Sequence, residues 1–369
     1  MGNLFDVTDF GAVPDGKTDC TECFQKAIDA AGDVLGTVVV PPGEYLCNGL
    51  KMRPRTGIVG YPSWSYRNAK GFSGGAAGGS VIKLLSGDNR CLLDITDAHG
   101  VTVKGLCLDG GGLGDGVCGV MRDKDEFGKE EDTPRIEECK IGFFTGDGVR
   151  LSKIWCFSVR HCYIHSNKGD GLYIAGWDGF IIDNWLSGNK GYGIGAGGPD
   201  GNAAIMATSN RIEWNQKGGI HIIDGNSWSI VGNSIDRSGG PAVYIADGRL
   251  ASHNITITGN VFNRSGAPWR GDMPEYESSH VYLERCFNVV CTANTLLVGR
   301  DDGAKGSFSP NYGIVVRKLK NSIVKDNVGQ NAAVKKFLID MGEHGENVKI
   351  ADNFGGNVDD IASYDWPSW

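Results

Sequence analysis

The chain has 369 residues, of which 57 are glycine and only 12 are proline, and 40% are hydrophobic. This composition supplies enough apolar material for a core and lacks the proline-rich bias of a disordered chain. The formal net charge of -8 argues against a general phosphate-binding surface, so nucleic acid is not an expected partner.

The cysteines and the N-terminal segment indicate in which cellular compartment the protein is expected. Eleven cysteines are spread along the chain, most of them in predicted strands, and the only close clusters are Cys20 with Cys23 and Cys156 with Cys162. We expect small buried thiols, no metal and no cofactor, and a reducing compartment, which favours the cytoplasm over secretion. No basic segment followed by an apolar one opens the chain, and no apolar run approaches the ~18 residues of a membrane span. A soluble chain without a membrane partner is therefore expected.

The first 50 residues are typical of a cap followed by the first strands. Residues 15–31 begin with acidic and hydroxyl side chains, carry apolar residues at helical spacing and stop at Gly32, which predicts one amphipathic helix. Residues 36–46 predict a buried strand followed by a turn. A helix over the open end of a stack of strands would cover its unpaired edge.

One sequence unit recurs from about residue 160 onward. Each copy joins an alternating apolar stretch, a glycine-rich bend and a second alternating stretch, which is strand patterning interrupted by turns. The spacing between successive starts runs from 22 residues (Cys162 to Asn184) to 34 residues (Asn260 to Asn294). This is too short for a strand–helix–strand unit and suits one turn of a solenoid built from three short strands.

The repeat also predicts which side chains stack. Asparagine recurs at the start of the unit, where it tolerates the left-handed backbone of a bend and can form a hydrogen-bonded ladder; the positions are Asn184, Asn210, Asn233, Asn260, Asn294 and Asn327. Two residues further on, an apolar position should point inward and stack from turn to turn: Ile164, Leu186, Ile212, Ile235, Phe262 and Leu296.

Together these patterns predict an all-β fold, a single-stranded right-handed parallel β-helix with an N-terminal capping α-helix. We expect one domain over residues 1–369. Its cap and first strands would occupy about residues 1–50, its regular coils about 100–340, and its C-terminal end 341–369.

Three segments near the N-terminus carry a family resemblance. Phe10-Gly-Ala-Val-Pro-Asp-Gly-Lys-Thr-Asp19, the helix that contains Gln25-Lys-Ala-Ile-Asp29, and Val38-Val-Val-Pro-Pro-Gly-Glu-Tyr45 resemble the opening of the pectate-lyase-like β-helix superfamily. That superfamily includes glycosidases, transglycosidases, lyases, uronate epimerases and phage tailspikes. Residues 106–110 and 195–201 are also similar to stretches of the inulin fructotransferase and difructose-dianhydride hydrolase group.

Missing motifs narrow what the resemblance implies. The Gly-His-Gly and Arg-Ile-Lys elements of polygalacturonases are absent, and so is the Asp-Pro-His-Glu signature of alginate epimerases. Pectin hydrolysis and alginate epimerisation are therefore less favoured than other reactions of the superfamily.

A column of polar residues lies three positions after each unit start. It reads His165, Ser187, Glu213, Asp236 and Asn263, on the face of the strand opposite to the stacked apolar side chains. Adjacent turns of a parallel sheet lie ~4.8 Å apart, so the carboxyl groups of Glu213 and Asp236 should lie within roughly 5–7 Å of each other. Two carboxylates this close repel, so one would hold a proton as an acid while the other acts as nucleophile or base.

Groups around this pair are typical of a sugar-binding wall. Asp200, in the glycine-rich loop 195–201, is a third predicted catalytic residue on the fructotransferase resemblance, unless it is a plain turn residue. Asp224 and Asp247 end the facing strands, where they would accept from sugar hydroxyls or serve as turn residues. The predicted substrate-binding residues are His165, Tyr173, Arg211, Trp214, His221, Asp224, Arg237, Tyr244, Asp247 and Arg264.

Three functions remain open. The first is a glycosidase or transglycosidase, with fructans as one candidate substrate and Glu213 with Asp236 as the reacting pair. The second is a polysaccharide lyase or uronate epimerase, in which carboxylates would bind Ca²⁺ and Arg237 or Arg264 would take the proton. The third is a non-catalytic, glycan-binding tailspike. In each case the partner is an oligo- or polysaccharide, and a homotrimer formed through residues 122–134, 267–279 and 300–311 is expected from fold analogy.

Overall fold

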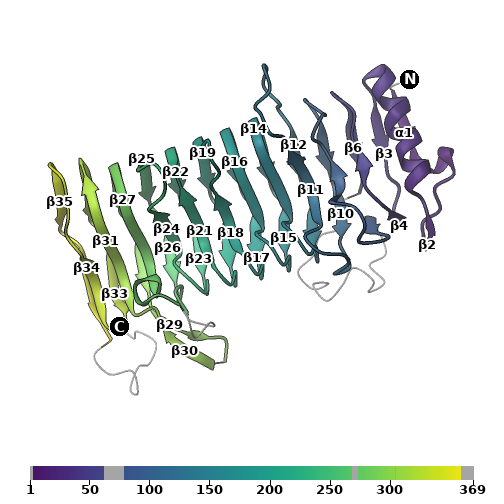
Figure 1. Cartoon of the computed structure of the whole chain (residues 1–369). Coiled ribbons are helices and arrows are strands. Elements are labelled where there is room, and N and C mark those ends of the chain that lie inside the picture. The colour runs from purple at the N-terminus through teal and green to yellow at the C-terminus, as the bar shows by residue number, and fades with distance from the viewer. Residues whose placement is uncertain (1–2, 62–78, 268–272, 304, 359–369) are drawn as a thin grey trace. The chain divides into compact units, whose positions relative to one another are not determined.

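A computed structural model describes residues 3–61, 79–267, 273–303 and 305–358 (Figure 1). The chain divides into two compact units, Met1–Ile194 and Gly195–Trp369. That the two units form one domain stays a prediction. The expected excursions at 267–279 and 300–311 and the C-terminal end at 341–369 lie partly outside the described residues.

Unit 1 consists of parallel strands in columns, in which each turn of the chain adds one strand to each column (Figure 1). One column contains β2 (Asp15–Asp19), β4 (Gly43–Cys47), β7 (Ser80–Leu84), β10 (Leu106–Asp109), β13 (Lys140–Gly142), β15 (Tyr163–His165) and β17 (Trp185–Ser187). A second contains β5 (Leu50–Lys51), β8 (Cys91–Asp94), β11 (Cys118–Asp123), β14 (Val149–Arg160) and β16 (Leu172–Ile182). A third contains β1 (Leu4–Asp6), β3 (Thr37–Val39), β6 (Gly57–Val59), β9 (Thr102–Lys104), β12 (Arg135–Glu137) and the later part of β14.

Unit 2 repeats this arrangement, and the division between the units falls within β18 (Tyr192–Ala196). One column contains β20 (Arg211–Glu213), β23 (Ser234–Asp236), β26 (Val261–Asn263), β28 (Thr295–Leu297), β33 (Val328–Ala333) and β36 (Phe354–Asn357). The second contains β21 (Gly218–Ile223), β24 (Val243–Ala246), β27 (Ser279–Thr292), β31 (Tyr312–Lys320) and β34 (Lys336–Asp340). The third contains β19 (Asn202–Thr208), β22 (Gly225–Val231), β25 (Ser252–Thr258), the later part of β27, β32 (Ser322–Lys325) and β35 (Val348–Ala351).

The stacked apolar positions lie in the core, as the repeat predicts. Ile212 pairs with Ile235, Ile235 with Phe262, and Phe262 with Leu296 on successive strands of unit 2. Each of these side chains is at most 3% exposed. Because side chains alternate along a strand, this register fixes the neighbouring positions on the opposite, outward face.

The recurrent asparagines form the predicted ladder in unit 2. The Asn260 side chain accepts from the backbone N–H of Asn233 at 2.9 Å and donates to the Asn294 side chain at 2.9 Å. The left-handed conformation, however, belongs to the residue before each asparagine, for example Gly232 (φ 65°) and Gly259 (φ 64°). The expected position of the bend was therefore wrong by one residue. The backbone N–H of each asparagine donates to the side chain of the next asparagine in the ladder, as Asn233 does to Asn260, and the left-handed residue comes just before it.

Helix α1 (Thr21–Val34) begins later and ends later than the predicted 15–31. Residues 15–19 form strand β2 instead, and Gly32 lies inside the helix, where a Cβ would come 2.8 Å from the Cβ of Arg53. The helix buries Phe24, Ala27 and Ile28 against unit 1. Its role as a cap stays a prediction.

Two further sequence expectations can be compared with the structure. All eleven cysteines are free thiols, and all but Cys23 and Cys156 are buried. Among the described residues, no helix has both the length and the apolar character that crossing a membrane requires.

Candidate functional site

The predicted acid pair lies in the expected register. Glu213 is directly opposite Asp236 on the parallel strands β20 and β23, and Asp236 is opposite Asn263 on β26. Both acids are on the face opposite to the core, yet Glu213 is only 3% exposed and Asp236 only 9%. The two carboxyl groups are therefore neighbours, but neither is freely open to solvent.

Arginines occupy both oxygens of Asp236. The Arg264 guanidinium donates from Nε to Oδ1 at 2.9 Å and from Nη2 to Oδ2 at 2.6 Å, and Arg237 donates from Nη1 to Oδ2 at 2.5 Å. Arg211 donates to the Glu213 carboxylate at 3.0 Å. Bidentate arginine–carboxylate pairs are among the stronger hydrogen-bonded contacts in proteins. The three hydrogen bonds from Arg237 and Arg264 occupy most of the lone-pair sites of the Asp236 carboxylate, which weakens Asp236 as a nucleophile or base.

The predicted aromatic residues of unit 2 stack on the outward face of the second column. Tyr244 is opposite His221 and Tyr282 in register, and its ring lies 5.2 Å from the His221 ring and 4.8 Å from the Tyr282 ring. Burial lowers the pKa of His221 to about 4, so the imidazole is neutral at pH 7. The Tyr244 hydroxyl lies 3.4 Å from a Glu284 oxygen. The Tyr244 and Tyr282 rings cover each other's faces, so this column presents ring edges and polar groups outward.

Several other predicted residues have local structural partners. Asp224 has a φ of 54° and accepts from the backbone N–H of Leu250 at 2.7 Å, which is the contact of a turn residue. Asp247 pairs with Arg285 at 2.7 Å, and Asp200 is exposed in its loop.

His165 differs most from its predicted role. Its side chain is 1% exposed and its ring stacks 4.2 Å from the Tyr163 ring, while burial lowers its pKa to about 3. A side chain this deeply covered offers no surface to a sugar.

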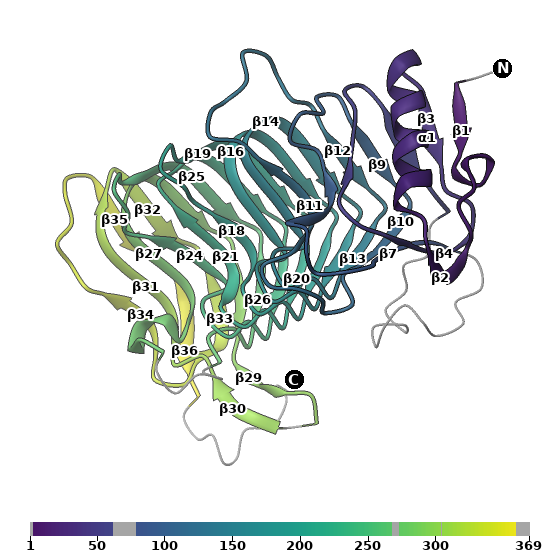
Figure 2. The same cartoon turned by 45° about the vertical axis from the view of Figure 1, so that its right-hand side comes forward.

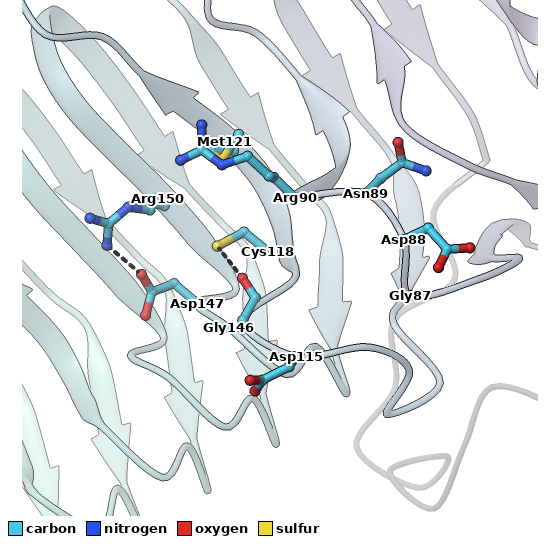
Figure 3. Close-up of a pocket in the computed structure, with 11 residues that line it drawn as sticks. Gly87, Asp88, Asn89, Arg90, Asp115, Cys118, Met121, Gly146, Asp147 and Arg150 are labelled. Carbon is cyan, nitrogen blue, oxygen red and sulfur yellow. Dashed lines mark hydrogen bonds and ion pairs between the residues drawn. The ribbon is translucent and has the colours of Figure 1, made fainter.

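A cavity of about 550 Å³ in unit 1 is a site that the repeat did not predict (Figure 3). Its walls come from the segment before β8, from the start of β11 and from the turn that leads into β14. Glycine allows the first two segments to meet, because a Cβ on Gly87 would lie 2.1 Å from the Cα of Gly114. The charged or polar lining residues are Asp88, Asn89, Arg90, Asp115, Asp147 and Arg150.

Arg150 is the best-positioned cation of this cavity. It pairs with Asp147 at 3.0 Å, and its guanidinium carbon lies 4.2 Å from the centre of the Tyr173 ring on the next strand. Burial raises the pKa of the Tyr173 phenol, against the opposing effect of the Arg150 charge, so the phenol keeps its proton at neutral pH. Asp147 also accepts from the backbone N–H of Asp170 at 2.7 Å, which fixes it in the turn.

The thiol of the cavity cysteine, Cys118, is buried. Burial raises the pKa of the Cys118 thiol to about 11, so the reactive thiolate is scarce at neutral pH. Arg90, in contrast, extends into solvent and pairs with Asp123, and its side chain is 71% exposed. Among the described residues, no group of three or more histidine, cysteine or acidic side chains lies where it could hold a metal ion.

A shorter repeat could have revealed Arg150. Gly146-Asp-Gly-Val-Arg-Leu151 and Gly169-Asp-Gly-Leu-Tyr-Ile174 match position by position, and the structure pairs Arg150 with Tyr173 in that register. Arg90 and Asp115 lie in irregular turns before residue 160, where no comparable signal exists.

Comparison with known families agrees with this architecture. The chain belongs to the right-handed beta helix family, whose model matches residues 147–354, which is more than half of the chain. Residues 4–86 match a second model, described as rhamnogalacturonase A/epimerase, pectate lyase-like. The resemblance to the pectate-lyase-like superfamily is thereby confirmed.

Curated relatives match parts of the chain. Alginate lyase 7 of Azotobacter vinelandii is 28% identical over 200 residues, 51% of this chain and 22% of the relative. The putative phage-related protein YobO of Bacillus subtilis (strain 168) is 28% identical over 291 residues, 70% of this chain and 31% of the relative. The chain thus spans between about a fifth and a third of the length of these relatives.

Solved structures share the fold at low identity. The A-module of the mannuronan C-5 epimerase AlgE6 of Azotobacter vinelandii has a TM-score of 0.64 at 18% identity, covering 96% of this chain and 100% of that chain. DFA-IIIase from Arthrobacter chlorophenolicus A6 has a TM-score of 0.68 at 14% identity, covering 93% and 88%. Tailspike protein 2 from Escherichia coli O157:H7 bacteriophage CAB120 has a TM-score of 0.67 at 12% identity, covering 88% and 43%.

Proposed function

We propose that this protein is a carbohydrate-active enzyme that binds an acidic polysaccharide in the cavity of unit 1 and acts on it by elimination or epimerisation at a uronate. The cavity carries this proposal, because two arginines line it and Tyr173, whose phenol keeps its proton, packs against one of them, Arg150. Partial relatives named as an alginate lyase and as mannuronan epimerases support the same substrate class.

The chemistry requires three groups. A uronate carboxylate must be neutralised by a cation before the proton on the neighbouring carbon can be removed, and a guanidinium does this with two parallel hydrogen bonds. Arg150 would serve this role, with Arg90 at the rim. Tyr173 would donate its phenolic proton to the leaving oxygen as a general acid. Asp115 lines the same cavity and has no ion pair within the described ranges, which makes it the candidate base.

The missing alginate-epimerase signature still matters for this proposal. The chain lacks Asp-Pro-His-Glu, so the residues that act here would differ from those that the signature supplies. The Arg150–Tyr173 contact is the specific alternative that this sequence offers.

A second candidate is glycoside hydrolysis or transfer by Glu213 and Asp236, with Asp200 shaping the sugar site. The register that places the two carboxyl groups side by side favours it. The arginine contacts of Asp236 oppose it, because hydrogen bonds from two guanidinium groups lower the basicity and nucleophilicity of a carboxylate. A fructan substrate and a homotrimer both remain predictions under this candidate. The non-catalytic glycan-binding role remains a separate prediction.

One product analysis separates these candidates. The purified chain would be incubated in D₂O with polymannuronate, polygalacturonate, inulin and a neutral glucan, and the products analysed by NMR and chromatography. Elimination gives an unsaturated uronate, epimerisation places deuterium at C5, and hydrolysis gives reducing ends without either change. We expect a uronate product that is lost in Arg150→Gln and Tyr173→Phe and kept in Glu213→Gln. The opposite pattern, with loss only in Glu213→Gln or Asp236→Asn, would move the reaction to the acid pair.

A further inference from the structure

Unit 2 contains a buried arginine whose hydrogen-bonding capacity is only partly used. Arg237 is 8% exposed, and its guanidinium carbon lies over the Trp214 ring, 4.9 Å from the ring centre. Nη1 donates to Asp236, and Nη2 donates to Asp302. The remaining donor, Nε, is buried and has no hydrogen-bond partner among the described residues. A buried donor without an acceptor is rare in a native fold and calls for an explanation.

The partner of Nη2 comes from an exposed hairpin. β29 (Gly299–Asp301) and β30 (Lys305–Ser309) form an antiparallel pair, and Asp302 follows β29 (Figure 2). The Asp302 side chain is 73% exposed, whereas the Arg237 side chain is 10% exposed. An exposed carboxylate therefore reaches one nitrogen, Nη2, of an otherwise buried guanidinium.

Arg237 has two donors on one edge that could both bind a carboxylate, but Asp302 accepts from only one of them. Nε and Nη2 lie on the same edge of a guanidinium, and together they match the two oxygens of one carboxylate. Arg264 uses this edge in full on Asp236, with contacts of 2.9 Å and 2.6 Å. Arg237 offers the same edge, but the contact with Asp302 occupies Nη2 alone.

The charges point to the same ligand. Arg237 and Arg264 bring two positive charges, and Asp236 neutralises one of them. Asp302 supplies the second negative charge from outside, with Arg264 Nη1 at 3.9 Å from its Oδ1. If Asp302 moves away, the site carries one unbalanced positive charge in a poorly solvated place, where an anion binds more strongly than at the surface.

We propose that Arg237 and Arg264 form a binding site for the carboxylate of an acidic sugar, and that Asp302 occupies this site in the free protein. The ligand carboxylate would displace Asp302 and accept from both Nε and Nη2 of Arg237. The inference rests on the proposed function for its substrate class, but the site lies in unit 2 and does not depend on the cavity of unit 1. Asp302 thus acts as a competitor that an acidic sugar must replace.

Binding measurements on hairpin variants test this assignment. Isothermal titration calorimetry with trigalacturonate and trimannuronate would compare the wild type with Asp302→Asn, with cellotriose as the neutral probe. We expect Asp302→Asn to bind at least one of the acidic trimers about tenfold more tightly, a factor that corresponds to ~1.4 kcal/mol. Cellotriose binding should not change. Adding Arg237→Lys should remove the gain, because an ammonium lacks the two-donor edge.

Matched variants make the outcomes distinct. The control is Asp326→Asn, which removes one negative charge from an exposed carboxylate elsewhere in unit 2 that pairs with Lys325. This variant should bind the acidic trimers as the wild type does. Unchanged or weaker binding of both acidic trimers to a folded Asp302→Asn protein would overturn the proposal and leave Asp302 as a tether of the hairpin. Should Asp302→Asn not fold, Asp302→Ser gives the same comparison. A gain in Asp302→Asn, with no turnover of any uronate by the wild-type protein, would refute the proposed reaction while supporting this site.

Discussion

Replacing Asn260 by alanine should destabilise unit 2 out of proportion to the size of the change. Asn260 is 1% exposed, and its Oδ1 accepts from the backbone N–H and the side-chain amide of Asn233 at 2.9 and 3.0 Å. Its Nδ2 donates to the Ile230 carbonyl at 3.0 Å and to Asn294 at 2.9 Å. Alanine removes all four contacts and leaves the Asn233 N–H without this acceptor.

The expected cost follows from what is left behind. A buried polar group that loses its partner costs about 1–3 kcal/mol, and the Asn233 side-chain amide keeps a second acceptor, the carbonyl of Ala207 at 2.9 Å. We therefore expect Asn260→Ala to lower the free energy of unfolding by about 2–4 kcal/mol. Urea unfolding followed by circular dichroism measures this loss. Asn331→Ala is the control, because that side chain is partly exposed, and it should shift stability by less than about 0.5 kcal/mol. Equal midpoints for the two variants would refute the ladder argument.

Three further predictions concern other parts of the chain. Arg150→Gln should weaken oligouronate binding by about tenfold to a hundredfold in calorimetry, because a charged hydrogen-bond donor is lost, while Arg135→Gln on an exposed strand of unit 1 should not. Asp132→Asn should lower the stability by about 3 kcal/mol in urea unfolding, because Arg122 is 1% exposed and pairs with Asp132 at 2.8 Å; a loss below about 0.5 kcal/mol would contradict this. Burial lowers the pKa of His280 to about 3, so the unfolded chain takes up a proton below pH 6.5 that the folded chain refuses. His280 alone should then contribute a fall in stability of about 1.4 kcal/mol per pH unit between pH 6.5 and about 3, and unfolding at several pH values should show a slope smaller by about that amount in His280→Gln.

The repetitive part of the fold could be predicted because its signals are local and periodic. The asparagines and the alternating apolar positions fix the register, and with it the adjacency of Glu213 and Asp236. The left-handed residue was misplaced by one position, because the sequence does not show which backbone N–H the ladder uses. Helix α1 was predicted too early, since residues 15–19 pair with β4 instead.

The side-chain partners of the acid pair could not be predicted in the same way. Trp214, Arg237 and Arg264 each follow a strand with a φ between 46° and 59°. Arg237 contacts Asp236 from the adjacent position in the sequence, whereas the contact of Arg264 with Asp236 comes from the next coil, which the local sequence does not show. The cavity of unit 1 was missed because its walls come from three irregular turns that are far apart in the chain.

The most direct test of the central claim compares one ligand in two chemical forms. An oligomannuronate and its carboxyl-reduced, neutral counterpart would be titrated into the wild-type protein under identical low-salt conditions. The account predicts binding of the acidic form, with at least about a tenfold loss on reduction of the carboxyl groups. Equal affinity for the two forms would show that no arginine of this protein recognises a sugar carboxylate.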